Sequence, residues 1–203
     1  MKLVCLDMEN VLWPEIWPEV AKATGVSELS KTTRDYQDTN ELYAMRSKYM
    51  KENNITLTTV RDVIATLEPM DGALDFIHEL QSFAQFVILS DTFTQFIPPI
   101  REKLGYPTIV CNKLVVDEND MIVGWDMRCD ETKLSTVKAF QSVGIDTICS
   151  GDSYNDLGMI QASKHGFLFN TTDEIRAKYP EIPTADTYEE LLALIKEAWY
   201  AED

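Results

Sequence analysis

The sequence predicts an α/β fold in which a doubly wound parallel sheet forms the core, with a helical insertion after the first strand and a small β-hairpin. Three observations predict it. Short apolar runs alternate with segments that have helical periodicity. One long interval shows the helical pattern alone. A later segment has two apolar runs on either side of a polar turn.

Five apolar runs are predicted to be buried parallel strands, because each is β-rich and is followed by polar or acidic residues. They cover residues 3–6, 86–89, 108–111, 147–149 and 167–169. Three intervening or following stretches, led by Leu74, Leu134 and Leu191, place apolar residues on one helix face. Strands and helices therefore alternate, as they do in a doubly wound sheet.

Residues 14–70 interrupt this alternation, since their apolar residues recur only at helical spacing. Ligands of open α/β sheets bind outside the carboxyl ends of strands, where such an insertion can close over them. Residues 114–127 (LVVDENDMIVGWDM) predict a β-hairpin. The expected domains are a core of residues 1–13 and 71–203 and a cap of residues 14–70.

The charge balance limits the classes of partner. The 203 residues include 18 Lys and Arg against 34 Asp and Glu, a net charge of −16, which argues against nucleic acid or an anionic membrane as a partner. No apolar stretch approaches the length of a membrane span, and the N-terminal apolar run is too short for a signal peptide, so a cytoplasmic location is expected. The four cysteines lack metal-site spacing.

Acidic residues follow two of the predicted strands. Asp7 and Glu9 come directly after the first, and Asp152 and Asp156 follow the fourth in the segment GDSYND. Carboxylates gathered at one sheet edge repel one another, and a hard divalent cation with oxygen ligands is the usual resolution. The sequence therefore predicts a Mg²⁺ site.

Groups suited to phosphate lie at the same edge. The segment LSDTF ends the second strand and offers the hydroxyls of Ser90 and Thr92. Lys133 begins the helix before the fourth strand and can reach a phosphate, whereas Lys138 lies farther along that helix. A candidate nucleophile (Asp7), a metal site and a cationic side chain (Lys133) at one sheet edge together indicate phosphoryl transfer.

The segments LDMENVL and ILSDTF, then Lys133 and GDSYND, resemble in this order the four motifs of the haloacid dehalogenase superfamily. Within it the chain is similar to the phosphoserine phosphatase branch. It most resembles the bifunctional enzymes of that branch, which also transfer the phosphoryl group to homoserine. The segments that carry this likeness are CLDMENVLWPEIW, TTRD, VIATLEPMDGA, FVILSDTF and GDSYND.

The resemblance implies a Rossmann-like core, one Mg²⁺ and an aspartyl-phosphate intermediate on Asp7. It makes Glu9 the acid that protonates the leaving oxygen and later the base that activates the acceptor. The implied metal ligands are the Asp7 carboxylate, the Glu9 backbone carbonyl and Asp152, with Asp156 either a direct ligand or a residue behind the ligands.

The resemblance also implies a phosphoric monoester hydrolase whose substrate is L-phosphoserine. The expected phosphate- and substrate-binding residues are Ser90, Asp91, Thr92, Lys133 and Asn155. In the cap, Glu15 is expected to bind the substrate amino group and Arg46 its carboxylate, with Arg34 as the competing choice. Water or homoserine as acceptor, and monomer or homodimer as assembly, are left open.

The chain departs from the branch pattern at several positions. Glu9 replaces the usual second Asp of the first motif, Asn10 stands where glycine is common, and Val11 stands where Thr is frequent. Asp91 and Thr92 replace a Gly-Gly pair. Two alternative functions remain open: a phosphatase for another small phosphomonoester, and a non-enzymatic acidic phospho-receiver module, since receivers also have acids at strand ends.

Overall fold

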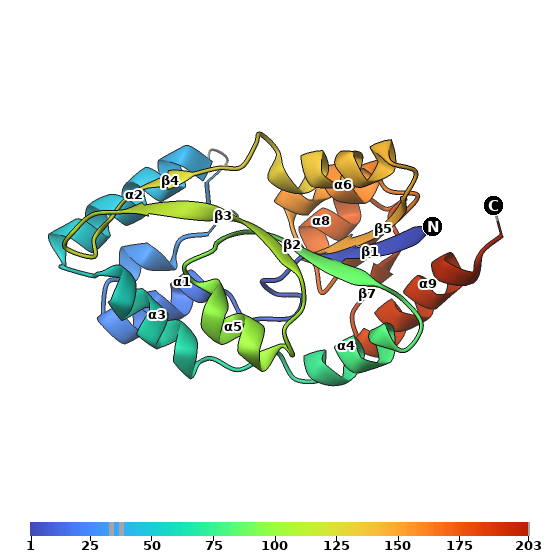
Figure 1. The fold of residues 1–203 in the computed structure, drawn as a ribbon, viewed down its shortest axis with the longest axis horizontal. Helices are drawn as coiled ribbons and strands as arrows, with labels where there is room; N and C mark the ends of the chain where they lie inside the picture. The colour runs from blue at the N-terminus through green and yellow to red at the C-terminus, as the bar shows by residue number, and fades with distance from the viewer. Residues whose placement is uncertain (33–34, 37–38, 203) are drawn as a thin grey trace.

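The computed structural model describes residues 1–32, 35–36 and 39–202, and this part of the chain forms a seven-stranded sheet (Figure 1). The strand order is β4-β3-β2-β1-β5-β6-β7, and all neighbours are parallel except β3 and β4. The strands are β1 (Lys2–Leu6), β2 (Phe86–Phe93), β3 (Ile109–Val116), β4 (Ile122–Asp126), β5 (Asp146–Gly151), β6 (His165–Phe169) and β7 (Thr184–Ala185).

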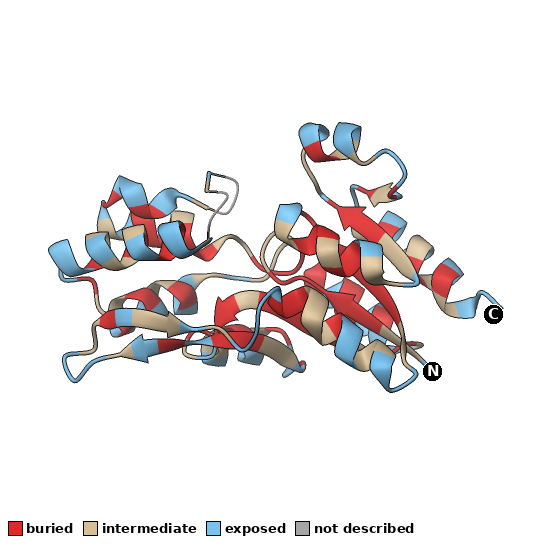
Figure 2. Cartoon of the chain, turned by 90° about the horizontal axis from the view of Figure 1, so that it is seen from above, coloured by how far each residue is buried: buried red, intermediate tan, exposed pale blue. Residues whose placement is uncertain are grey.

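Helices cover both faces of this sheet, as the alternation predicts. Along β1, Val4 and Leu6 belong to one apolar cluster, whereas Cys5 belongs to the other, because successive strand residues point to opposite faces. The first face is covered by α4 (Ala73–Gln81), α5 (Ile97–Lys103) and α9 (Tyr188–Tyr200), and the second by α6 (Thr132–Ser142), α7 (Leu157–Ala162) and α8 (Asp173–Lys178). The central strands are buried along most of their length (Figure 2).

The interval between β1 and α4 is helical, as predicted. It contains α1 (Ile16–Thr24), the 3₁₀ helix η1 (Ser27–Ser30), α2 (Thr39–Glu52) and α3 (Leu57–Thr66), which gather at one end of the molecule (Figure 1). The chain returns to the core where the Met70 N–H donates to the Leu12 carbonyl, 3.1 Å away. The division of the chain into core and cap remains a prediction.

The predicted strand at residues 108–111 and the first arm of the predicted hairpin form one strand. β3 pairs with β2 through Ile109 and Val110 and with β4 through its second half, from Lys113 to Val116. A single long strand thus pairs with β2 in its first half and with β4 in its second half, and β4 contacts α2. Among the described residues, no helix is long and apolar enough to cross a membrane.

Candidate active site

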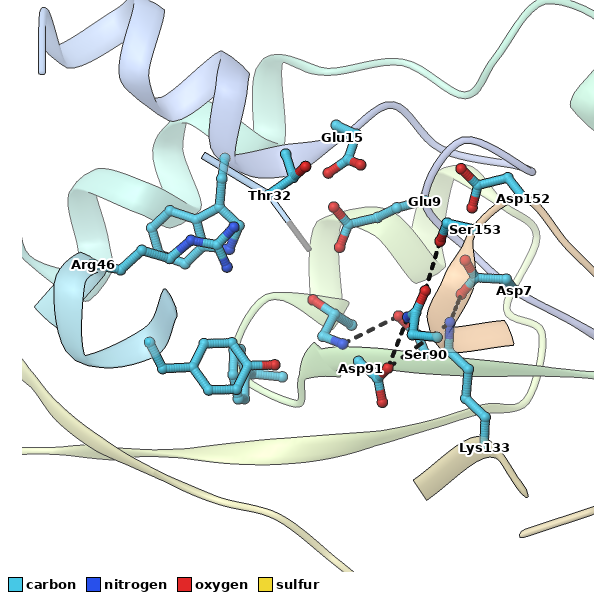
Figure 3. Close-up of a pocket in the computed structure, with 15 residues that line it drawn as sticks. Asp7, Glu9, Glu15, Thr32, Arg46, Ser90, Asp91, Lys133, Asp152 and Ser153 are labelled. Carbon is cyan, nitrogen blue, oxygen red and sulfur yellow. Dashed lines mark hydrogen bonds and ion pairs between the residues drawn. The ribbon is translucent and has the colours of Figure 1, made fainter. Parts of the chain in front are cut away.

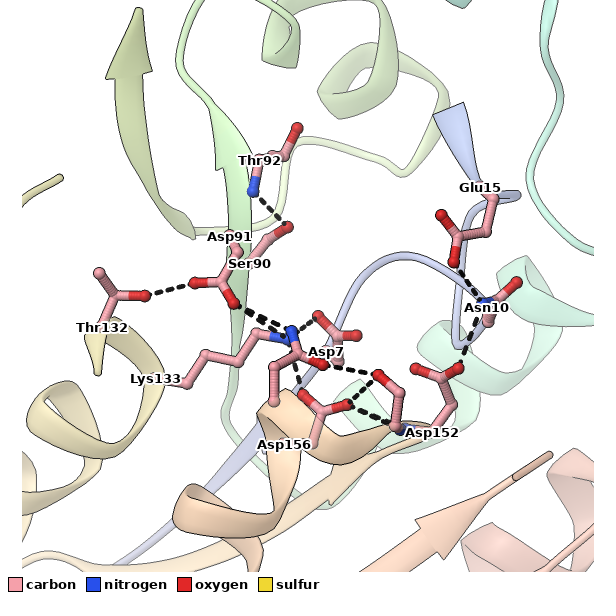
Figure 4. Close-up of polar contacts among 12 residues, drawn as sticks. Asp7, Asn10, Glu15, Ser90, Asp91, Thr92, Thr132, Lys133, Asp152 and Asp156 are labelled. Atoms are coloured by element: carbon pink, nitrogen blue, oxygen red, sulfur yellow. Dashed lines mark hydrogen bonds and ion pairs between the residues drawn. The ribbon is translucent and has the colours of Figure 1, made fainter. Parts of the chain in front are cut away.

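Three carboxylates meet at the carboxyl ends of the central strands. Asp7 follows β1 and Asp152 follows β5, and these strands are neighbours in the sheet. Asp156 ends the 3₁₀ helix η2 (Tyr154–Asp156), which directly follows. One carboxylate oxygen from each of the three residues lies within 4.8 Å of the others, and all three side chains are buried (Figure 4).

The segment GDSYND places Asp156 through backbone contacts. Its Oδ2 accepts the backbone N–H groups of Asp152 and Ser153, each at 3.1 Å, and Ser153 forms a capping box with it. Gly151 must be glycine, since a Cβ there would lie 2.3 Å from Asp156 Cγ. The loop is therefore built around the Asp156 carboxylate.

Lys133 supplies positive charge to this cluster. Its Nζ lies 2.7 Å from Asp7 Oδ1 and 2.6 Å from Asp156 Oδ1. Burial disfavours its charged form, but these carboxylates outweigh burial and hold the pKa of Lys133 well above its ordinary value. Burial, followed by the charge of Asp156, raises the pKa of Asp7 above its usual range even though Lys133 opposes the shift.

The end of β2 forms the next wall of the site. The Ser90 hydroxyl accepts the Thr92 N–H at 3.2 Å, and Asp91 accepts the Thr132 hydroxyl and, at 2.9 Å, the Asn155 amide. Burial alone would raise the pKa of Asp91, but the Lys133 charge and these hydrogen bonds lower it. Asp91 is thus an ionised carboxylate that orients Asn155.

Glu9 faces the helical insertion. Its Oε2 accepts the Ile16 N–H at 3.0 Å, at the first turn of α1, where the helix dipole favours a carboxylate. Burial, and after it the nearby charge of Glu15, nevertheless raises the pKa of Glu9 to about 8. At neutral pH this side chain holds a proton.

Arg46 is buried on α2, with 6% of its surface exposed. Its guanidinium stacks 4.4 Å above the Trp17 ring, and its Nη2 donates to the Lys31 carbonyl at 2.8 Å. Its buried Nε has no hydrogen-bond partner among the residues that the structure describes. Burial lowers its pKa to about 10, so it stays charged at neutral pH. The competing residue, Arg34, lies outside the described residues.

All these elements line one cavity (Figure 3). Ten predicted site residues contribute to its wall: Asp7, Glu9, Glu15, Arg46, Ser90, Asp91, Thr92, Lys133, Asp152 and Asn155. Asp156 is not in the wall and lies behind it, against Lys133. Five lining residues were not predicted: Trp17, Thr32, Tyr43, Phe93 and Ser153.

Two of these five residues, Trp17 and Tyr43, are aromatic side chains of the helical insertion. Tyr43 does pack against the rings of Phe93 and Trp125, and Trp17 supports Arg46, yet both also line the cavity. Tyr43 lies three residues before Arg46 on one helix face, so helical spacing could have identified it.

Comparison with known proteins identifies the family. No family model matches the sequence. Over 94% of its length the chain is 41% identical to phosphoserine phosphatase ThrH of Pseudomonas aeruginosa, of which it covers 93%. It is 39% identical, again over 94% of its length, to a phosphoserine phosphatase of Pseudomonas syringae pv. tomato, of which it covers 81%.

Among solved structures, a phospho-aspartyl intermediate analogue of phosphoserine phosphatase matches with a TM-score of 0.75. That match covers 95% of this chain and 97% of the other at 20% identity, so it supports the fold. Relatives of this kind do not support the phospho-receiver alternative. The chain therefore belongs to the phosphoserine phosphatase branch of the haloacid dehalogenase superfamily and is a phosphoric monoester hydrolase.

Proposed function

We propose that this chain is a Mg²⁺-dependent phosphoserine phosphatase that works through an aspartyl-phosphate on Asp7. The observation that carries the proposal is the buried cluster of Asp7, Asp152 and Asp156, which faces a cavity lined by hydroxyls and Lys133. The names of the two relatives support the substrate, and the phospho-aspartyl analogue among the similar structures supports the intermediate.

The cluster suits a divalent cation because its negative charge exceeds its positive charge. The cluster holds three buried carboxylates and one ammonium group, that of Lys133, which pairs with Asp7 and Asp156, and such an excess favours a hard cation with oxygen ligands. The Asp7 and Asp152 carboxylates and the Glu9 backbone carbonyl would hold Mg²⁺. Both oxygens of Asp156 already accept hydrogen bonds, which favours a place behind these ligands. A bound Mg²⁺ would offset the charge of the phosphoryl oxygens.

The chemistry assigned to the protein has two steps. Asp7 attacks phosphorus and the bond from phosphorus to the serine oxygen breaks, while Glu9 gives its proton to that oxygen. Glu9, now a carboxylate, then takes a proton from the acceptor, whose oxygen attacks phosphorus and releases Asp7. Ser90, Thr92 and Lys133 bind the phosphoryl oxygens during both steps.

The insertion is assigned the recognition of the amino acid. Glu15 and Arg46 both line the cavity from the insertion, and they offer a carboxylate for an ammonium group and a guanidinium for a carboxylate (Figure 3). The buried Nε of Arg46 has no hydrogen-bond partner within the described part of the chain, so a substrate carboxylate is a candidate acceptor for it. This pair of opposite charges favours an amino-acid phosphomonoester over a substrate without these groups.

Product analysis tests the proposal. The protein is incubated with L-phosphoserine with Mg²⁺ or with EDTA, and in a third arm with Mg²⁺ and homoserine. We expect serine and inorganic phosphate with Mg²⁺ and neither with EDTA. Phosphohomoserine in the third arm would identify homoserine as an acceptor. Absence of all these products, or full turnover by Asp7→Asn, would refute the assignment.

A further inference from the structure

Asn10 occupies a turn between the nucleophile's strand and the insertion. Its backbone has φ = +60°, and its N–H donates to the Trp13 carbonyl at 2.7 Å. This left-handed conformation suits glycine, and asparagine is among the few other residues that adopt it at low cost. The backbone alone therefore does not require a side chain at this position.

The side-chain amide of Asn10 bridges two carboxylates (Figure 4). Its Nδ2 donates to Glu15 Oε1 at 3.0 Å and to Asp152 Oδ2 at 3.1 Å. Because both neighbours are acceptors, the NH₂ group and not the carbonyl oxygen must face them, and each of its two hydrogens has a carboxylate partner. Hydrogen bonds to ionised acceptors are the stronger kind.

These two carboxylates serve different parts of the proposed reaction, on which this inference rests. Asp152 belongs to the acidic cluster, whereas Glu15 lies at the start of α1 in the insertion. We infer that Asn10 is a positioning residue that fixes both the metal-binding carboxylate of Asp152 and the substrate-binding carboxylate of Glu15 with one amide group. A glycine would provide the turn and neither hydrogen bond.

The variant Asn10→Gly tests the inference because it removes the amide and keeps the turn. Mg²⁺ binding is titrated by isothermal calorimetry without substrate, so that the readout does not depend on turnover. We expect the Kd for Mg²⁺ to rise about 10-fold, the lower end of the loss found when the partner of a metal ligand is removed. The melting temperature without metal should fall by no more than roughly a few degrees, because glycine keeps the turn at a positive φ although two hydrogen bonds are lost.

Steady-state kinetics at saturating Mg²⁺ test the other half of the bridge. In Asn10→Gly the KM for L-phosphoserine should rise about 10-fold, as expected when the group that binds the substrate amine loses its support. The KM for p-nitrophenyl phosphate, which has no amino group, should stay within about two-fold of the wild type. A general disturbance of the site would instead raise both values.

Asn54→Gly is the matched control, since Asn54 also has a positive φ, 53°, and lies exposed at the end of α2. It should leave the Mg²⁺ affinity and both KM values unchanged. If Asn10→Gly binds Mg²⁺ as tightly as the wild type, or if both substrates lose affinity equally, the inference is wrong. A wild-type protein that neither binds Mg²⁺ nor hydrolyses phosphoserine would instead refute the proposed function.

Discussion

Lys133 places one buried ammonium group between the carboxylates of Asp7 and Asp156. Removing one partner of a buried ion pair typically costs about 3–5 kcal/mol, because the remaining charge stays desolvated. We expect Lys133→Met to lower the free energy of unfolding by about this amount at pH 7.5 in EDTA, as measured by urea denaturation. We therefore expect Lys133 to stabilise the fold in addition to its proposed role in binding the phosphoryl group.

The pH dependence of this loss identifies its cause. An acid whose folded-state pKa is raised above its unfolded value destabilises the fold as pH rises above that unfolded value. In Lys133→Met the carboxylates lose their counter-charge, so the loss should be smaller at pH 5 than at pH 7.5. Lys138→Met, at an exposed position of the same helix, should have little effect at either pH. A loss independent of pH would indicate a packing defect.

The raised pKa of Glu9 determines the alkaline side of the pH–rate profile that we expect. With its pKa raised to about 8, the carboxyl is protonated at neutral pH and can protonate the leaving oxygen. Loss of this proton above pH 8 should lower kcat/KM for phosphoserine, so the profile should fall through about pH 8. Glu9→Gln should lose about 10²–10⁴-fold in rate and the alkaline fall with it. With p-nitrophenyl phosphate, whose leaving group needs no protonation, the loss should be much smaller.

We expect Arg46 to make the protein selective for substrates that carry a carboxylate. Arg46→Ala should weaken transition-state binding of phosphoserine by about 1.5–3 kcal/mol, the value of a hydrogen bond to a charged group, and should leave p-nitrophenyl phosphate nearly unchanged. The ratio of the two kcat/KM values is the measurement. Arg61→Ala, at an exposed position of α3, is the control. Equal losses on both substrates would favour another phosphomonoester as the substrate.

At this scale, the sequence could predict residues that follow strands and could not predict those brought in by tertiary packing. Asp7 and Asp152 can be predicted because they follow parallel strands that end at one sheet edge, and Ser90 because it lies in the last half of β2; the structure brings all three to one cavity. Thr32 lies in the insertion, far from any strand end. Its position depends on how the helices pack on the core, which no local pattern specifies.

Among the elements, α3 is held at both ends by charged residues from outside the insertion. At its first turn, Asp120 of the β3–β4 turn accepts the Thr58 N–H at 2.8 Å through Oδ2. At its last turn, Lys103 of α5 donates to the carbonyls of Ala65 and Leu67. These charges match the helix dipole, and the half-buried Asp120 has a lowered pKa chiefly because of its hydrogen bonds to Thr58. The insertion is thereby tied to the hairpin and to α5.

This arrangement predicts that the hairpin turn stabilises the insertion. Asp120→Gly should lower the melting temperature by roughly a few degrees, because the first turn of α3 loses an N-terminal hydrogen-bond acceptor while glycine keeps the positive φ of this position, 63°. Differential scanning calorimetry measures the shift. Glu118→Ala, an exposed acid in the same turn, should leave it unchanged. Equal shifts for the two variants would mean that net charge alone is responsible.

Two strands, β3 and β7, could not be predicted correctly from the sequence pattern. The sequence divides β3 because Asn112 and Lys113 are polar residues between two apolar runs. Both lie within one strand, Asn112 buried and Lys113 exposed, and this strand changes partner from β2 to β4. β7 contains two residues, Thr184 and Ala185, too few for any periodic signal. The other strands and the long helices could be predicted because their burial repeats along the chain.

For the whole molecule, the net charge of −16 predicts how catalysis responds to salt. An enzyme that attracts an anionic substrate with a positive field loses kcat/KM as salt screens that field. Here Lys133 is neutralised by its own carboxylates, so the overall charge repels phosphoserine and screening weakens that repulsion. We therefore expect kcat/KM to stay within about two-fold, or to rise, between about 0.05 and 0.3 M KCl. Potassium acetate as a second salt would separate screening from chloride binding at the phosphate site. A roughly ten-fold fall of kcat/KM in both salts would mean that the local positive charges of Arg46 and Lys133 outweigh the negative net charge of the molecule.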